Sequence, residues 1–138
     1  MAKRGGTKHL KRIAIPKAFP VKNKKEYTWM IQSSPGPHNK FHSAPLLILL
    51  RDLLGFAKTA RDAKRILNTR LVSVDGFVRT DPAFPVGLFD VIHFSKVDKY
   101  YRVFVDHKGR LYAKEAEKSN ADKKLLKVVG KMLLQKQR

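Results

Sequence analysis

Cationic side chains recur at helical spacing in the middle of the chain. Arg61, Lys64, Arg65 and Asn68 follow one another in steps that bring them to one face of a helix. Cations one helical turn apart can meet successive phosphates of a nucleic-acid strand. In most proteins such a face is simply solvated. Here the only interleaved acid is Asp62 and the chain carries a formal charge of +19, so we expect contact with RNA or DNA.

The cationic face requires a helix, and the neighbouring residues supply helix signals. The Thr59 hydroxyl can cap the first turn, and Asp62 at the third position favours the positive end of the helix dipole. Lys58 precedes the cap, and the amide groups near Thr59 can bind a phosphate oxygen as well. The other side carries an apolar stripe that would pack on the core, formed by Ala60, Ala63, Ile66 and Leu67.

A first helix is predicted just upstream, over residues 43–54. Ser43 can cap it, Pro45 is tolerated in its first turn, and Gly55 is placed to end it in the left-handed conformation. Its apolar positions cover well over half of the circumference, which is typical of a helix buried on most sides; they are Leu46, Leu47, Leu49, Leu50, Leu53 and Leu54. The short connection to Thr59 then predicts a tight helix pair.

Strands are predicted after the helix pair. Asp75-Gly76 lies between two short apolar runs, which is a strong signal for a two-residue β-hairpin turn. A further strand is expected over 91–94, and a second hairpin with a longer turn over 100–112. The pattern of residues 122–129 is compatible with a helix or a strand.

The first 42 residues are rich in Pro, Gly and cations and lack helical periodicity, so we expect an extended basic arm. Such an arm can be a solvated, disordered tail, or it can become ordered along a nucleic-acid groove. Phe19, Tyr27 and Trp29 could stack on bases, but we expect them to anchor the arm to the domain. The arm's cationic residues are Lys3, Arg4, Lys8, His9, Lys11, Arg12, Lys17, Lys22, Lys24 and Lys25.

Composition narrows the classes of function. A hydrophobic content of 43% requires a buried core, and the absence of cysteine excludes disulfides, thiolate zinc sites and cysteine nucleophiles. His38 and His42 are four residues apart but no acid accompanies them, so we expect no metal site. We also expect no cofactor and no enzymatic activity, because no catalytic constellation stands out. The longest apolar run, 44–50, is too short to span a membrane, which favours a soluble intracellular protein.

The helix pair and the strands after it resemble a known RNA-binding module. The run Thr-Ala-Arg-Asp-Ala-Lys-Arg-Ile-Leu, then Val-Ser-Val-Asp-Gly-Phe-Val and Pro-Val-Gly-Leu-Phe-Asp-Val-Ile, are similar to the alpha-L RNA-binding motif over about residues 43–95. Ribosomal proteins, pseudouridine synthases and some tRNA synthetases share that motif. It implies RNA binding without saying which RNA.

The flanking sequence is similar to the S-four-e (S4e) family of small-subunit ribosomal proteins of archaea and eukaryotes. The resemblance begins with Lys-His-Leu-Lys-Arg-Ile-Ala at residues 8–14 and continues through Pro-Gly-Pro-His at 35–38. It extends in the right order over roughly residues 7–112. The chain departs from the family by having Phe19 where members usually carry Trp or Tyr. It also stops before the family's β-rich central domain and small KOW-type barrel, so we expect the C-terminal part to be absent.

The resemblance implies a structural constituent of the small ribosomal subunit, in the cytoplasm, that binds rRNA and lies beside other ribosomal proteins. We expect no DNA or membrane partner and no obligate homo-oligomer. The alternatives are a detached module of an RNA-modifying enzyme, or a basic protein of DNA or membrane surfaces. The predicted rRNA contacts are Lys3, Arg4, Lys8, His9, Lys11, Arg12, Lys17, His38, Lys40, Lys58, Thr59, Arg61, Lys64, Arg65 and Arg79. Arg51 could instead be structural, paired with Asp52.

The expected fold is α+β in three parts. Residues 1–42 form the basic arm, 43–95 the alpha-L-type domain of two helices and a hairpin, and 96–138 a hairpin and tail that begin an incomplete β-rich domain.

Overall fold

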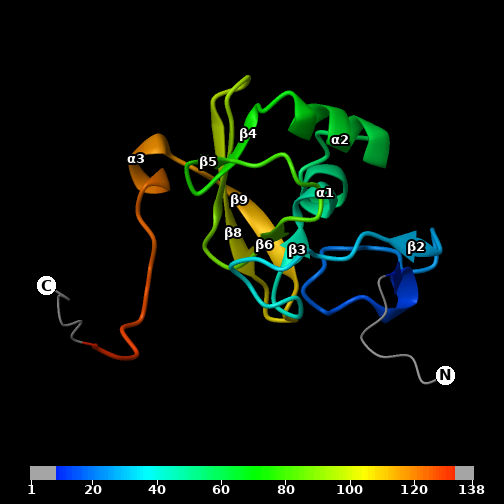
Figure 1. Ribbon diagram of the computed structural model, residues 1–138, viewed down its shortest axis with the longest axis horizontal. Coiled ribbons are helices and arrows are strands. Elements are labelled where there is room, and N and C mark those ends of the chain that lie inside the picture. Colours follow the sequence, from blue (N-terminus) through cyan, green and yellow to red (C-terminus); the bar gives the residue numbers. More distant parts are fainter. Residues whose placement is uncertain (1–8, 133–138) are drawn as a thin grey trace, which may run out of the picture.

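The chain forms a mixed assembly of short helices and antiparallel strands (Figure 1). The structure is a computed structural model that describes residues 9–132. It agrees with the α+β class expected from the sequence. In chain order the elements are β1 (Leu10–Lys11), the 3₁₀ turn η1 (Arg12–Ala14), β2 (Trp29–Met30), β3 (Ala44–Pro45), α1 (Leu46–Ile48), η2 (Leu49–Leu53), α2 (Ala60–Asn68), β4 (Val72–Val74), β5 (Phe77–Val78), β6 (Pro85–Val86), β7 (Val91–Phe94), β8 (Lys99–Val105), β9 (Leu111–Ala116) and α3 (Lys118–Ala121).

A five-stranded antiparallel sheet, in the order β5-β4-β7-β8-β9, is the main β-structure. The predicted two-residue hairpin is confirmed, because Val74 pairs with Phe77 and both turn residues have positive φ, 49° at Asp75 and 80° at Gly76. The sheet is continuous across residue 95, since Val91 of β7 pairs with Arg102 of β8. The second hairpin therefore extends the same sheet as the first.

The first helix runs from α1 into η2, which is a turn of π-helix. The amide of Leu54 donates to the carbonyl of Leu49 at 2.8 Å, and Gly55 follows with φ of 69°, as predicted for the residue that ends the helix. The prediction that Ser43 caps this helix was wrong. Its hydroxyl donates to the Asn39 carbonyl at 2.9 Å, while the free amides at the start of α1 donate to carbonyls of the 82–84 loop.

The second helix, α2, begins as predicted with a capping box. The Thr59 hydroxyl accepts a hydrogen bond from the Asp62 amide, and the Asp62 carboxylate accepts one from the Thr59 amide. Ala63 and Leu67 are fully buried and Ile66 is half-buried, which confirms most of the apolar stripe. Ala60 is exposed, contrary to the prediction, because it lies at the rim of an open hollow.

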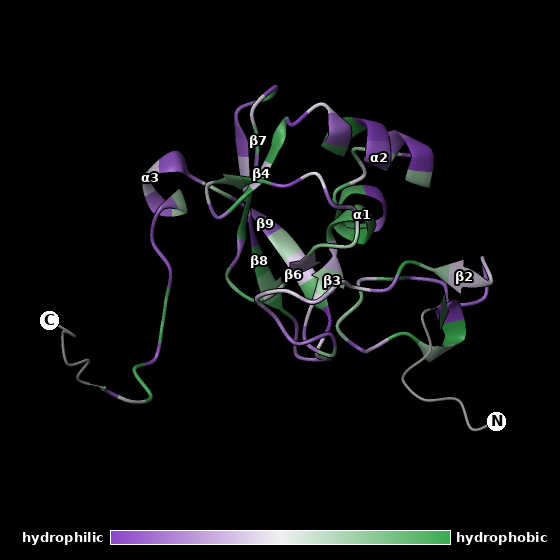
Figure 2. Cartoon of the chain, viewed as in Figure 1, coloured by the Kyte–Doolittle hydropathy of each residue, from purple (hydrophilic) through white to green (hydrophobic). Residues whose placement is uncertain are grey.

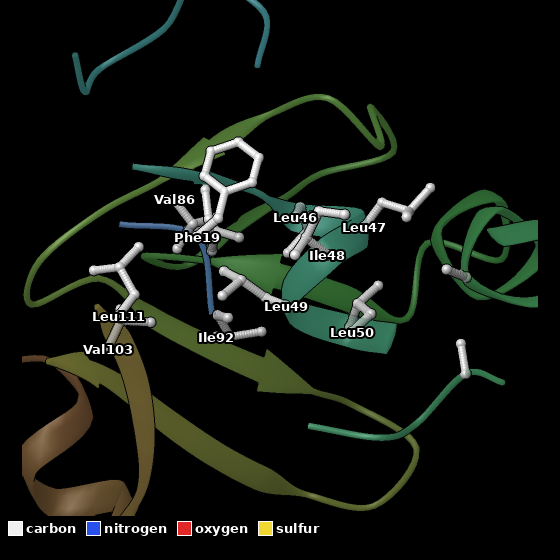
Figure 3. Packing of buried hydrophobic residues seen from close by; sticks show 14 of the residues in the cluster. Phe19, Leu46, Leu47, Ile48, Leu49, Leu50, Val86, Ile92, Val103 and Leu111 are labelled. Atoms are coloured by element: carbon white, nitrogen blue, oxygen red, sulfur yellow. The ribbon is translucent and has the colours of Figure 1, made fainter. Parts of the chain in front are cut away.

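The hydrophobic core lies between the first helix and the sheet (Figure 3). Leu46, Ile48, Leu49 and Leu50 are completely buried, so this helix contributes apolar side chains from most of its circumference. Ile92 and Val103 from the sheet meet them, together with Leu111 and Phe19. In Figure 2 the first helix is largely hydrophobic, whereas α2 carries a broad hydrophilic face.

The described part of the N-terminal region packs on the domain and is not an extended arm. β1 and β2 pair as a small antiparallel sheet, with Lys11 opposite Trp29. Phe19 is buried in the core, and the Leu111 amide donates to the Ala18 carbonyl at 3.0 Å, which ties the segment to β9. Burying a phenylalanine contributes roughly 2–3 kcal/mol, which favours the packed position of this segment. Lys3, Arg4 and Lys8 lie outside the described residues.

The C-terminal segment leaves the sheet through α3 and continues to residue 132 without a helix or strand, so residues 122–129 form neither of the two elements considered. Two ion pairs of Lys124 hold it near the sheet, and the Arg102 guanidinium donates to the carbonyls of Asn120 and Lys123. Lys124 Nζ lies 2.8 Å from a carboxylate oxygen of Asp75 and also contacts the buried Asp90.

Candidate nucleic-acid interface

The outer face of α2 carries the cations that the sequence placed there. Arg61, Lys64 and Arg65 are all exposed, and Lys58 is exposed just before the helix. Within the described residues none of the four is in an ion pair; the ion pairs that occur involve other side chains. Because Asp62 is the only acid on this helix and it forms no ion pair with any of the four, these cations are available to phosphates.

The start of α2 is less suited to an anion than the sequence suggested. The Thr59 hydroxyl donates to Asp62 at 2.7 Å, and the Thr59 amide donates to the same carboxylate at 3.1 Å. The hydrogen bond from the Thr59 hydroxyl is the main reason why the pKa of Asp62 is lowered, with smaller effects of Arg65 and Arg61. An ionised carboxylate therefore already occupies this helix end. Thr59 is a capping residue in this structure, and a phosphate is better placed along the helix face.

Four of the predicted contacts in the N-terminal region are exposed: His9, Lys11, Lys17 and Lys40. Arg12 is not, and its placement as an rRNA contact is corrected. Only 3% of Arg12 is exposed. Its Nε donates to the Asn23 carbonyl at 2.7 Å, a second nitrogen lies 3.2 Å from Glu26, and its guanidinium lies 5.2 Å from the centre of the Tyr27 ring. Arg12 therefore holds together the loop between β1 and β2.

His38 is half-buried and has a structural contact, so its role at the rRNA stays a prediction. Its Nε2 lies 2.7 Å from a carboxylate oxygen of Asp90, which is 1% exposed and also accepts the Gly87 amide at 2.9 Å. Burial alone would raise the pKa of Asp90, but the hydrogen bonds with His38, Gly87 and Lys124 outweigh it and hold the pKa below its ordinary value. These bonds join the Pro-Gly-Pro-His loop, the turn before β7 and the C-terminal segment.

Arg79 and Arg51, the other arginines singled out in the sequence, differ in their surroundings. Arg79 is half-buried, with its guanidinium 4.4 Å from the centre of the Phe84 ring, so only part of it can reach a ligand. Arg51 pairs with Asp52 through two hydrogen bonds of 2.7 and 3.0 Å, as the structural interpretation of this residue expected. The hydrogen bond with Asp52 is the main reason why the pKa of Arg51 is raised.

Tyr27 and Trp29 were expected to anchor the N-terminal segment, and this was wrong for both. Their side chains are exposed and line a hollow of about 620 Å³ together with residues 51–60. Phe19 alone of the three aromatics is an anchor. The N-terminal segment and the start of α2 thus share one surface.

Residues 9–132 contain neither a metal-binding cluster nor a membrane-spanning helix. No three His, Cys, Asp or Glu side chains there lie close enough together to hold a metal ion. No helix in this range has the length and apolar character needed to cross a membrane.

Comparison with known protein families assigns most of the chain. Residues 4–41 match the RS4NT (NUC023) domain, residues 45–92 the S4 domain, and residues 97–138 the ribosomal family S4e. The middle match covers the helix pair, the first hairpin and the cationic face of α2. Fold and sequence together define a protein with an S4 RNA-binding domain.

Individual relatives agree with this class. The chain is 48% identical over 131 residues to the small ribosomal subunit protein eS4 of Methanosphaera stadtmanae, covering 95% of this chain and 54% of the relative. It is 47% identical over 126 residues to the eS4 protein of Archaeoglobus fulgidus, covering 91% and 52%. The chain therefore spans about half the length of these relatives.

A solved structure is also similar. The crystal structure of the 30S ribosomal protein S4e from Thermoplasma acidophilum matches with a TM-score of 0.50 and 36% identity, over 58% of this chain and 41% of that one. Together with the three family matches, these relatives show that the chain is similar to ribosomal S4e proteins over most of its length.

Proposed function

We propose that this protein is a structural constituent of the small ribosomal subunit and binds its rRNA through the outer face of α2 and the exposed cations of the N-terminal segment. The observation that carries the proposal is that Arg61, Lys64 and Arg65 on the exposed face of α2, and Lys58 just before it, form no ion pair within residues 9–132. The S4 domain match over the same residues and the names of the relatives support it. Neighbouring ribosomal proteins and a place in the cytoplasmic ribosome belong to the same proposal.

The balance of charge supports a polyanionic partner. A formal charge of +19 makes the folded chain repel itself, and the cations of α2 lie within a turn of one another without acids to offset them except Asp62. Phosphates relieve this repulsion and release condensed counterions as they bind. RNA of the subunit is the polyanion that the family assignment favours.

Crosslinking to purified ribosomal RNA tests the proposal. The chain is mixed with 16S-type small-subunit rRNA, with large-subunit rRNA and with duplex DNA, and binding is measured by filter retention at fixed salt. We expect the tightest binding to small-subunit rRNA, with ultraviolet crosslinks in the peptides that contain residues 58–65. Equal retention of all three nucleic acids, or crosslinks confined to peptides outside α2 and the N-terminal segment, would contradict it.

A further inference from the structure

The hollow beside α2 contains two exposed aromatic rings that the cationic face does not explain. Trp29, the single tryptophan of the chain, is 59% exposed, and Tyr27 is 57% exposed. Leaving two large rings in water forgoes the stabilisation that burial would give. Both line the same hollow, from positions two residues apart in the chain.

The surrounding structure holds these rings in place. The backbone of Trp29 pairs with Lys11, and the His9 ring meets the Trp29 ring edge-on at 5.4 Å and 83°. Tyr27 lies under the guanidinium of Arg12, which is fixed in turn by the Asn23 carbonyl. Rings ordered before binding lose little conformational entropy when a planar group stacks on them.

The hollow also has the right size and construction for a small planar ligand. Its volume of about 620 Å³ lies in the usual range for small-molecule sites. One wall is the segment 26–29, and the other comes from the end of the first helix and the start of the second, including Arg51 and Lys58. The two walls are held by separate elements, so a ligand between them touches both regions of the predicted interface.

Charge in the hollow favours a base over a phosphate. The carboxylates of Glu26 and Asp52 line it and would repel a phosphate, yet each is paired with an arginine, at 3.2 Å with Arg12 and 2.7 Å with Arg51. Lys58 is the lining cation without such a partner among the described residues. Aromatic rings can stack on the face of a neutral base, and the ion-paired polar groups beside them can form hydrogen bonds with its edge.

We propose that this hollow binds an unstacked base of a single-stranded RNA segment, with the base stacked against Trp29 and Tyr27. Lys58 and the outer face of α2 then hold phosphates of the same strand. This inference rests on the proposed RNA binding and deepens it, because it names the form of RNA that the interface selects. Phosphate contacts position the strand, and the hollow requires a base that is free of its duplex.

Trp29 is its own reporter, because tryptophan emission from the chain comes from this site alone. The full chain is titrated with single-stranded oligoadenylate, with an RNA duplex of equal length and with inorganic polyphosphate. We expect strong quenching by oligoadenylate, weak quenching by the duplex and none by polyphosphate, which carries charge without bases. Equal quenching by polyphosphate, or no quenching by a bound oligoadenylate, would overturn the stacking proposal.

Substitutions provide the second arm, with affinity measured by the anisotropy of labelled oligoadenylate. Trp29→Ala and Tyr27→Ala should each weaken binding roughly 5- to 150-fold, whereas Trp29→Phe should keep most of it. Tyr112→Ala is the matched control, since Tyr112 is an exposed aromatic residue on β9 outside the hollow and should leave affinity unchanged. Circular dichroism of each variant checks that the fold is retained.

The outcomes separate this inference from the proposed function. Oligoadenylate binding that depends on Arg61, Lys64 and Arg65 but is unaffected by Trp29→Ala overturns the stacking site and leaves the rRNA proposal standing. Failure of the chain to bind any RNA overturns both.

Discussion

Replacing the three cations of α2 by alanine tests how many phosphates the helix face contacts. Arg61, Lys64 and Arg65 are exposed and form no ion pair in the described part of the chain, and alanine is a better helix former than any of them, so the triple variant should fold normally. Each phosphate contact adds roughly 0.7–0.9 to the slope of log affinity against log salt. Three lost contacts should flatten the slope by about 2 to 3. At 0.1 M salt the same relation gives affinity that is roughly 100- to 500-fold weaker.

The assay is filter binding to small-subunit rRNA over a range of potassium chloride concentrations. A charge-matched control replaces Lys96, Lys108 and Lys114, exposed residues of the sheet's turns and outer strand that also form no ion pair in the described chain. Both variants lower the formal charge from +19 to +16. If the two variants lose the same slope and affinity, net charge alone governs binding and the helix face is not the site. If only the α2 variant changes, the contacts are local.

Three predictions concern stability, each measured by urea denaturation. Asp90→Asn should lower the free energy of unfolding by about 3 kcal/mol at neutral pH, because it breaks a buried charged network. Since the folded pKa of Asp90 is lowered, its ionised form stabilises the wild type above about pH 4, and this stabilisation is lost as the pH falls through the folded pKa. The Asp90→Asn variant should lack that acid-dependent loss of stability. Phe19→Ala should cost about 3–5 kcal/mol by leaving a cavity beneath the N-terminal segment, and an unchanged midpoint would contradict its anchoring role. Thr59→Ala should cost about 1 kcal/mol by removing the cap of α2, with Thr59→Ser as the variant that retains it.

Much of the fold was predictable because its signals are local. The capping box of Thr59 and Asp62 lies within four residues, and the Asp75-Gly76 turn specifies its hairpin by backbone conformation alone. The cationic face of α2 follows from helical spacing once the cap is placed. These features depend on neighbours in sequence, so no knowledge of tertiary packing was needed.

The features that the sequence did not predict share a different cause, which is contact with partners distant in sequence. Arg12 looks like its cationic neighbours, but Asn23 and Glu26 bury it. His38 is held by Asp90, which lies 52 positions later in the chain. Ser43 has a hydroxyl group that could cap a helix, but carbonyls of the 82–84 loop accept the hydrogen bonds from the helix amides instead. The sequence pattern identifies the type of each side chain but not the partner that the side chain contacts in the fold.

The same limitation explains why the hollow was missed and why it matters. Tyr27 and Trp29 have the large aromatic side chains that often anchor a segment to a core. Only the packing of the segment 26–29 beside residues 51–60 reveals that they face an open site. A cationic helix face binds any polyanion, so it gives affinity and strong salt dependence with little choice of partner. A site that stacks a base adds selectivity for single-stranded RNA without adding positive charge. Substitutions in α2 should therefore change the salt slope, whereas those at Trp29 should change the preference for single strands over duplex at an unchanged slope, because each part of the interface contributes a different physical term.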